Sequence, residues 1–138
     1  MDPRPNRDIA GTAPRPRLLI ADDDSVVRSA LSLQLSNAFQ VVGSARDAAE
    51  AVALAGELQP DLAIVDVEMP AGGGPRAARG IGAASPSTAI VALSIDESRD
   101  VVLEMLDAGA VTYIRKGVSG RELLSTLLQC IKATAQRP

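Results

Sequence analysis

Histidine is absent from this chain of 138 residues, and aromatic residues are nearly so: there is one tyrosine, one phenylalanine and no tryptophan. Without histidine, catalytic triads and metal sites that use imidazole are excluded, which leaves carboxylate, hydroxyl and amine chemistry. Only Phe39 and Tyr113 could stack on bases, and the net charge is −3, which does not suit a nucleic-acid surface. We therefore expect no direct binding of nucleic acid.

Cysteine and long apolar runs are also scarce. The single Cys130 cannot form an intrachain disulfide, which fits a reducing cytoplasm, and we expect its thiol to be packed and unreactive. The longest apolar runs, 51–55 and 89–93, are five residues long, against the ~20 needed to span a bilayer. The N-terminus lacks the apolar core of a signal peptide. These features predict a cytoplasmic protein that does not span a membrane.

The chain divides into a short tail and one domain. Residues 1–16 contain four prolines among polar residues and show no apolar periodicity, so we expect a flexible tail. The domain is expected to cover residues 17–135. Since 46% of the chain is hydrophobic, this length is enough to bury one core.

Within the domain, short apolar runs alternate with longer segments of helical periodicity. The predicted strands are 17–21, 41–45, 61–65, 89–94 and 111–114. The clearest helices have apolar faces formed by Val26, Val27, Ala30, Leu31 and Leu35, by Val101, Val102, Met105 and Leu106, and by Leu123, Leu124, Leu127, Leu128 and Ile131. Five strands alternating with five helices predict an α/β fold, a doubly wound parallel sheet with helices on both sides.

The segment 71–85 gives the weakest helical pattern. Its glycines predict a short, poorly specified and locally mobile third helix, in which a loop at 72–74 precedes Pro75. Gly72, Gly74 and Ala77 loosely fit a dinucleotide-binding pattern. That fingerprint must follow its strand directly, however, and Pro70 intervenes. We therefore expect no dinucleotide site.

Acidic residues follow two of the predicted strands. Asp22, Asp23 and Asp24 come directly after the first strand, and Asp66 ends the third. Parallel strands place such ends at one edge of the sheet. Two carboxylates about 4 Å apart repel by ~1 kcal/mol in water and by ~4 kcal/mol at an effective dielectric constant near 20, so the fold must either keep them apart or neutralise them with a cation. A divalent metal held by oxygens would supply it, while Asp24 is expected to cap the helix that follows.

These residues, together with Ser94 and Lys116 after the fourth and fifth strands, resemble the response-regulator receiver domains of two-component signalling. The similarity extends from about Arg17 to Ala135 and includes the sequence Asp-Val-Glu-Met-Pro that begins at Asp66. It implies a CheY-like, flavodoxin-like (βα)5 fold with strand order 2-1-3-4-5. It also implies a signalling switch that accepts a phosphoryl group from a histidine kinase or phosphotransfer protein, and not an enzyme acting on other substrates.

The resemblance assigns a role to each matching residue. Asp66 is implied to be the phosphoacceptor, assisted by Lys116 and Ser94. Ser94 and Tyr113 are the implied switch residues. Mg²⁺ or Mn²⁺ is implied to be held by Asp23 and Asp66, by Asp22 through water, and by the backbone carbonyl of Glu68. Glu68 and Asp96 occupy positions that tune the lifetime of the phosphorylated state in this family.

The resemblance also implies partners. Phosphorylation is expected to change the surface formed by the fourth helix, fifth strand and last helix, which would act on an output domain or a downstream protein or form a homodimer. Two positions depart from the commonest receiver pattern. Ile95 stands where a small residue is frequent and is expected to cover Asp66 in part, and Gly117 stands where many receivers have proline.

An alternative is a phosphatase of the haloacid-dehalogenase type. Residues 18–26 fit its pattern of an apolar run followed by D-x-D-x-V, with Asp22 as nucleophile and Asp24 as acid and base. That family needs a further acidic strand end after its lysine, whereas Glu122 is the only acid after Lys116. The order of motifs therefore favours the receiver.

Overall fold

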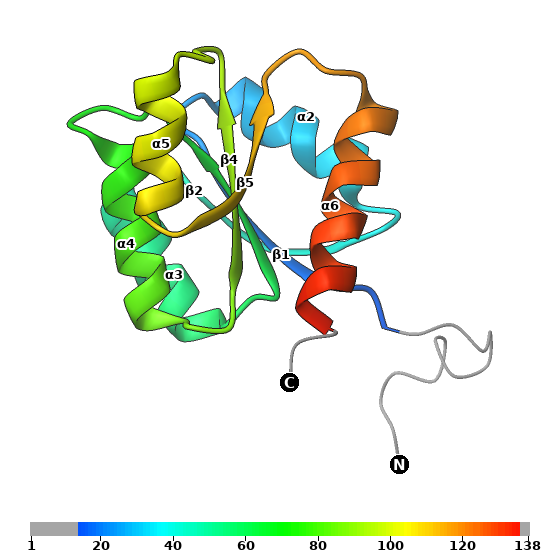
Figure 1. Ribbon diagram of the computed structural model, residues 1–138. Coiled ribbons are helices and arrows are strands. Elements are labelled where there is room, and N and C mark those ends of the chain that lie inside the picture. Colours follow the sequence, from blue (N-terminus) through cyan, green and yellow to red (C-terminus); the bar gives the residue numbers. More distant parts are fainter. Residues whose placement is uncertain (1–13, 136–138) are drawn as a thin grey trace.

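Five strands and five helices alternate in the computed structural model, which describes residues 14–135 (Figure 1). The strands are β1 (Arg17–Ala21), β2 (Gln40–Ala45), β3 (Leu62–Asp66), β4 (Ala89–Ser94) and β5 (Ala110–Arg115). The helices are α2 (Ser25–Leu35), α3 (Ala48–Leu58), α4 (Gly73–Ala84), α5 (Arg99–Asp107) and α6 (Gly120–Ala135). All five predicted strands are confirmed. Most of the predicted tail, 1–16, lies outside the described residues, and 14–16 form neither helix nor strand.

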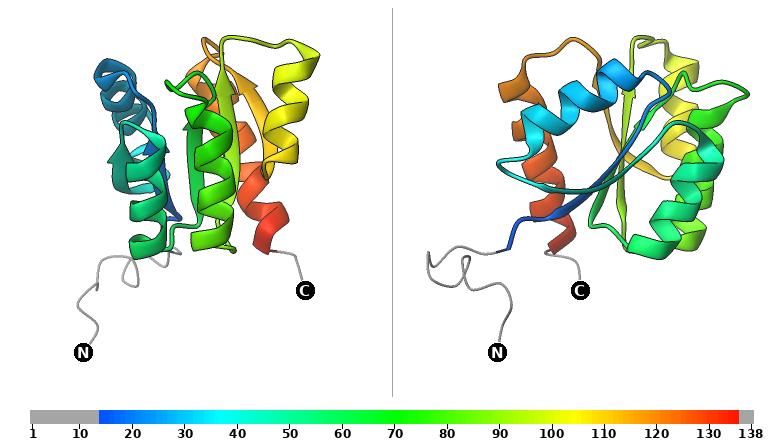
Figure 2. Two further views of the ribbon diagram at one scale, coloured as in Figure 1. Left: turned by 90° about the vertical axis from the view of Figure 1, so that its left-hand side faces the viewer. Right: turned by 180° about the vertical axis from the view of Figure 1, so that it is seen from behind.

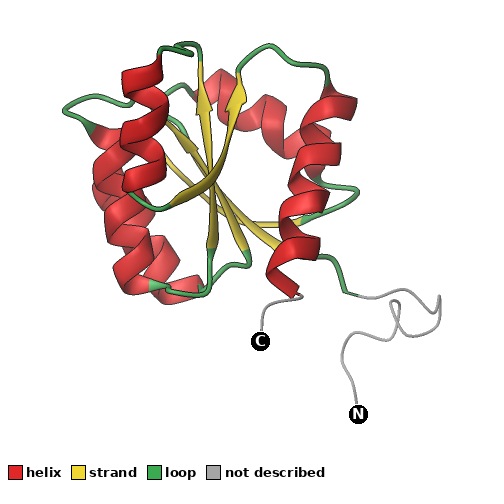
Figure 3. Ribbon diagram, in the orientation of Figure 1, coloured by secondary structure: helices red, strands yellow, loops and turns green. Residues whose placement is uncertain are grey.

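All strands are parallel and form one sheet in the order β2-β1-β3-β4-β5, as expected (Figure 3). From β1 the chain proceeds to β2 on one side, and β3 then lies on the other side of β1. The winding direction therefore reverses between β1 and β3. In sheets of this kind, ligands bind in the crevice at the carboxyl ends of the strands at such a reversal.

The sheet is covered on both faces, with α2 and α6 on one and α3, α4 and α5 on the other (Figure 2). Successive side chains of β1 alternate between them: Leu18 and Ile20 pack with α2 and α6, and Leu19 and Ala21 with the other helices. Burial on both faces explains why the central strands are continuous apolar runs. Each fully buried leucine or isoleucine contributes about 1.5–3 kcal/mol to folding.

The third predicted helix is longer and better packed than expected. α4 has 12 residues, so the prediction of a short, poorly specified helix in 71–85 is wrong, and two of the three residues expected in a loop, Gly73 and Gly74, form its first turn. A Cβ added to Gly74 would lie 2.6 Å from both the Cα and the carbonyl oxygen of Val67. Glycine, although of low helix propensity, is required at Gly74 because the packing leaves no space for a side chain. Local mobility of this segment stays a prediction.

Four side chains of the predicted apolar faces, Ala30 among them, are exposed instead of buried. Val26, Leu106 and Leu128 are 74%, 42% and 43% exposed. Successive helical residues are rotated by about 100°, so the neighbour of a buried residue such as Leu127 turns toward solvent. The buried stripes are therefore narrower than predicted.

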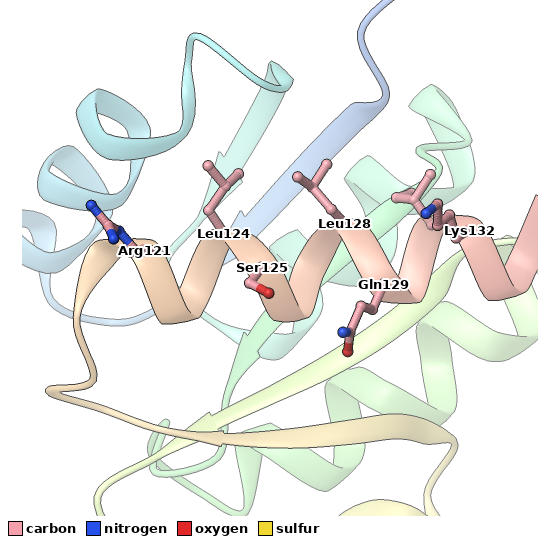
Figure 4. A pocket seen from close by; sticks show the side chains of 7 residues that line it. Arg121, Leu124, Ser125, Leu128, Gln129 and Lys132 are labelled. Carbon is pink, nitrogen blue, oxygen red and sulfur yellow. The ribbon is translucent and has the colours of Figure 1, made fainter.

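Leu128 borders a shallow groove along α6, and Figure 4 shows it projecting from the same side of the helix as Leu124. The residues that line this groove are Arg121, Leu124, Ser125, Leu128, Gln129, Ile131 and Lys132. Its apolar centre therefore has a basic residue at each end.

The predicted capping role of Asp24 is confirmed. Its Oδ1 accepts hydrogen bonds from the amides of Val26 (2.8 Å) and Val27 (3.4 Å) at the start of α2. Losing this cap in Asp24→Ala is expected to lower the free energy of unfolding by about 1 kcal/mol in urea denaturation. Asp24→Asn removes the charge but keeps an acceptor, so it should remain close to wild type. Equal losses in the two variants would contradict a capping role.

Candidate functional site

The acidic residues meet at the carboxyl ends of β1 and β3. These strands pair directly, with Ala21 opposite Val65, so the next residue in each strand direction is an aspartate, Asp22 or Asp66. Both side chains are buried, with 1% exposure, while Asp23 is exposed. Carboxylate oxygens of the three residues lie within 4.8 Å of one another. The sheet thus forms the shared acidic pocket that the sequence predicted.

Asp22 is held in place from several sides. Its amide donates to the carbonyl of Ala45 (3.0 Å), and its Oδ1 accepts from the amide of Asp24 (2.9 Å). Arg28 of α2 donates through Nη1 to the carbonyl of Asp22 (2.7 Å). The role of Arg28 was not predicted. Arginine is common on the solvent-facing side of an amphipathic helix, so its presence there does not indicate a hydrogen bond to the carbonyl of Asp22.

Lys116 reaches the pocket from the end of β5. Its Nζ lies 3.0 Å from Oδ1 of Asp66 and 3.2 Å from Oδ2 of Asp22. Its amide donates to the carbonyl of Ser94 (2.8 Å), which ties the ends of β4 and β5 together. The lysine side chain is 23% exposed, so it joins two buried carboxylates while remaining accessible to water.

The buried charges perturb one another. Burial raises the pKa of Asp66 from 3.8 to about 6, and the negative charge of Asp22 acts in the same direction, against Lys116 and the amide of Glu68. Burial by itself would lower the pKa of Lys116, but its hydrogen bonds and charge interactions with Asp66 and Asp22 raise it above its ordinary value. One ammonium therefore faces an excess of carboxylates.

This composition fits a hard divalent cation. Three carboxylates converge, two of them buried, and only one lysine neutralises them. Oδ2 of Asp22 is buried and, among residues 14–135, has no hydrogen-bond partner beyond its ion pair with Lys116. Carboxylate oxygens are the ligands that Mg²⁺ prefers, and a few suffice because this ion keeps several waters. The donor set is thus suited to Mg²⁺ or Mn²⁺.

The switch candidates lie beside this pocket. Ser94 is fully buried at the end of β4, and its hydroxyl donates to the carboxylate of Glu68 and accepts from the amide of Asp96 (2.9 Å). The hydroxyl of Tyr113, on β5, is buried. Burial raises the pKa of this phenol, whereas interaction with Ser94 lowers it. Tyr113 is opposite Ala92 in the β4–β5 pairing, two residues before Ser94, so the two switch candidates lie on adjacent strands.

The contact of the Glu68 side chain with Ser94 was not predicted. The sequence suggested only the backbone carbonyl of Glu68 as a ligand and a general effect of its charge. A carboxylate two residues after a strand gives no indication that it will cross to the next loop. Asp96 lies in that loop, and its own carboxylate accepts from the amide of Ser98 (2.8 Å).

Two departures from the receiver pattern have structural outcomes. Ile95 is 71% exposed, so most of its side chain is turned toward solvent instead of covering Asp66. Gly117 has φ +96°, a backbone conformation that proline cannot adopt. The loop after Lys116 therefore requires the glycine that this chain has.

The phosphatase alternative gains no support from the geometry. Its acid and base would be Asp24, but that carboxylate is engaged with the first amides of α2.

Of the helices in residues 14–135, none combines the length and apolar character that crossing a membrane requires.

Comparison with known proteins gives one consistent result. Residues 18–128 match the family model described as the response regulator receiver domain. The transcriptional regulatory protein PdtaR of Mycobacterium tuberculosis is 39% identical over 124 residues, covering 89% of this chain and 60% of PdtaR. The response regulator GacA of Pseudomonas viridiflava is 34% identical over 113 residues, covering 80% of this chain and 53% of GacA. The chain thus spans between half and two thirds of these relatives.

Solved structures agree with this match. The signal receiver domain of the response regulator NarL from Mycobacterium tuberculosis has a TM-score of 0.81 at 27% identity, covering 87% of this chain and 98% of that domain. The response regulator domain of Thermotoga maritima CheB has a TM-score of 0.75 at 32% identity, covering 90% and 99%. The likeness therefore extends over nearly the whole of each domain.

Proposed function

The chain belongs to the response regulator receiver domain family, and from this we propose that residues 17–135 form a receiver in which Asp66 accepts a phosphoryl group from a histidine kinase or phosphotransfer protein. The observation that supports the assignment best is the buried Asp66 carboxylate, which lies beside Asp22 and Asp23 with Nζ of Lys116 at 3.0 Å. A buried acid in such a cluster is costly to the fold. A role in chemistry accounts for its presence.

In the proposed reaction, an oxygen of Asp66 attacks the phosphorus of a phosphohistidine. The new P–O bond forms as the P–N bond breaks, and the imidazole leaves with the electron pair of that bond and takes up a proton. The product is an acyl phosphate on Asp66. Phosphoryl transfer of this kind depends on positioning and charge neutralisation more than on covalent catalysis by the protein.

Asp22, Asp23, Asp66 and the backbone carbonyl of Glu68 would hold Mg²⁺ or Mn²⁺. When bound, this ion neutralises the charge of the phosphoryl oxygens and helps to orient them. The chain's own contribution is rigidity: the amide of Asp24 donates to Oδ1 of Asp22 (2.9 Å), and the amide of Glu68 donates to Oδ1 of Asp66 (3.1 Å). Lys116 would supply a second cation for the incoming oxygens, and Ser94 a hydroxyl donor.

The switch would follow from added charge. A phosphoryl group on Asp66 brings roughly −1.5 to −2 charges and three acceptor oxygens. Ser94 would move toward it, and Tyr113, on the neighbouring strand β5, would occupy the space that Ser94 leaves. The surface of α5, β5 and α6 would then change and engage an output domain, a downstream protein or a second copy of the chain. Glu68 and Asp96 would set the lifetime of the phosphorylated state.

We further propose that the chain works in the cytoplasm and catalyses only its own phosphorylation and dephosphorylation. The relatives that support the family assignment are regulators by name, and this chain spans 53% of GacA and 60% of PdtaR.

Labelling with a small phosphodonor tests the proposal. Incubation with acetyl phosphate and Mg²⁺ is expected to add the mass of one phosphoryl group to the intact protein, measured by mass spectrometry. Asp66→Asn should remove the adduct completely, because an amide cannot act as the nucleophile. Chelation of the divalent ion should also suppress it.

Asp24→Asn is the matched control, since it removes one acidic charge next to the pocket while retaining the helix cap. It should still be labelled. Labelling that persists in Asp66→Asn would contradict the receiver assignment. An adduct located on Asp22 would favour the phosphatase alternative instead.

A further inference from the structure

Two hydrogen-bond donors at the end of β4 are occupied by one side chain. The Ser94 hydroxyl donates to Oε2 of Glu68, and the amide of Ile95 donates to Oε1 of the same carboxylate (3.3 Å). Glu68 belongs to the loop after β3, whereas Ser94 and Ile95 lead into the loop after β4. The glutamate therefore bridges the two loops that border the acidic pocket.

These donors lie next to the phosphoacceptor. Asp66 is opposite Leu93 in the β3–β4 pairing, so Ser94 is one position further along the same edge. The amide of Val67 also donates to the carbonyl of Leu93 (3.0 Å), which continues the ladder past Asp66. A group attached to the Asp66 carboxylate would come within reach of Ser94 and Ile95 without a rearrangement of the sheet.

A carboxylate and a phosphoryl group compete for the same donors. Both present charged oxygens that accept strong hydrogen bonds from hydroxyl and amide groups. The Ser94 hydroxyl and the Ile95 amide cannot donate to both acceptors at once. A phosphoryl group on Asp66 would also repel the negatively charged Glu68.

We infer that the Glu68 carboxylate is an internal competitor of the phosphoryl group: it occupies Ser94 and Ile95 in the unmodified protein and must leave before the phosphoryl oxygens can use them. This inference rests on the proposed function of Asp66. It goes beyond a general charge effect, because it assigns the effect of Glu68 to two named hydrogen bonds. Glu68 is thus a positioning residue that lowers the affinity of the pocket for phosphoryl groups.

Trifluoroberyllate, which coordinates a carboxylate and mimics a phosphoryl group, provides the test. Its apparent dissociation constant in the presence of Mg²⁺ would be measured from amide NMR shifts for the wild-type chain and for Glu68→Ala. Freeing the two donors is expected to tighten binding about tenfold. Glu68 is exposed, so the substitution should not prevent folding.

Glu97→Ala is the matched control. It removes the same charge from the loop after β4, but the Glu97 carboxylate pairs with Arg115 (3.7 Å) and not with the pocket donors. The affinity of the Glu97→Ala variant for trifluoroberyllate should differ from that of wild type by less than about twofold, because solvent and salt screen charges at this distance. In a Ser94→Ala background, the gain from Glu68→Ala should shrink, because one of the contested donors is already gone.

The outcomes separate this inference from the proposed function. If the wild-type chain binds trifluoroberyllate and Glu68→Ala binds it no more tightly, or Glu97→Ala gains as much, the competition is overturned while the receiver assignment stands. The competition is also overturned if Glu68→Ala increases the affinity for trifluoroberyllate by the same factor in the Ser94→Ala background and leaves the amide shift of Ile95 unchanged. If the wild-type chain neither binds the mimic nor is labelled at Asp66, both are overturned.

Discussion

Gly74→Ala is expected to destabilise the protein by about 3 kcal/mol, because the added methyl group collides with main chain that cannot move aside. Its Cβ would lie 2.6 Å from the Cα and carbonyl oxygen of Val67 and 2.9 Å from the carbonyl carbon. Val67 directly follows Asp66, so any relief of the collision would displace the acidic pocket. Urea denaturation followed by circular dichroism would measure the loss, and acetyl phosphate labelling should slow in the same variant.

Gly82→Ala is the control for this prediction. It lies in the same helix, is exposed, and an added Cβ would have no neighbour within 4 Å. Alanine has the higher helix propensity, so this variant should be more stable than wild type by up to about 1 kcal/mol. Similar effects of the two substitutions would show that helix propensity, and not the contact with Val67, decides the stability of α4.

Asp66→Asn is expected to stabilise the protein in the absence of divalent ions, by about 2 kcal/mol at pH 7. Asp22 and Asp66 share one lysine, so removing the charge of Asp66 leaves a balanced pair of Asp22 and Lys116. Denaturation in the presence of a chelator would measure the difference. A saturating concentration of Mg²⁺ should raise the stability of wild type more than that of the variant, since binding to the folded state alone stabilises it.

The pH dependence of this effect has a definite sign. The pKa of Asp66 is raised in the folded protein, from 3.8 to about 6, so folding favours its protonated form. The wild-type chain therefore loses stability relative to Asp66→Asn as the pH rises through this interval, and the difference should level off above it. Glu57→Gln removes one exposed charge elsewhere and should show no such trend. If the difference in unfolding free energy between wild type and Asp66→Asn does not vary between about pH 4 and 7, folding does not raise the pKa of Asp66.

Much of the fold could be predicted because the local signals agree. β1 and β4 have the predicted bounds, and β3 differs by one residue at each end, since strands buried on both faces stand out in the sequence as continuous apolar runs. α4 was underestimated for the opposite reason. Its glycines reduce helix propensity, and the benefit of Gly74 lies in its close approach to Val67, which propensity does not describe.

The residues of the site also fall into those that could be predicted from the sequence and those that could not. The meeting of Asp22, Asp23 and Asp66 follows from where the strands end, and Lys116 follows from the family resemblance. The contacts of Arg28 and of the Glu68 side chain could not be predicted, because Arg28 reaches back from α2 to Asp22 and Glu68 crosses from the loop after β3 to the end of β4. Sequence patterns locate elements and their ends, whereas such crossings depend on three-dimensional detail.

The pairing of β1 with β3 also fixes the dimensions of the pocket. Neighbouring strands are held about 4.8 Å apart by their hydrogen bonds, so the main-chain spacing of Asp22 and Asp66 is set by the ladder and not by the loops that follow. A different spacing would require β1 to slip by one residue, which would turn its core-facing side chains to the opposite face. Changes in the loops and helix surfaces should therefore leave the distance between the main chains of these two aspartates unaltered.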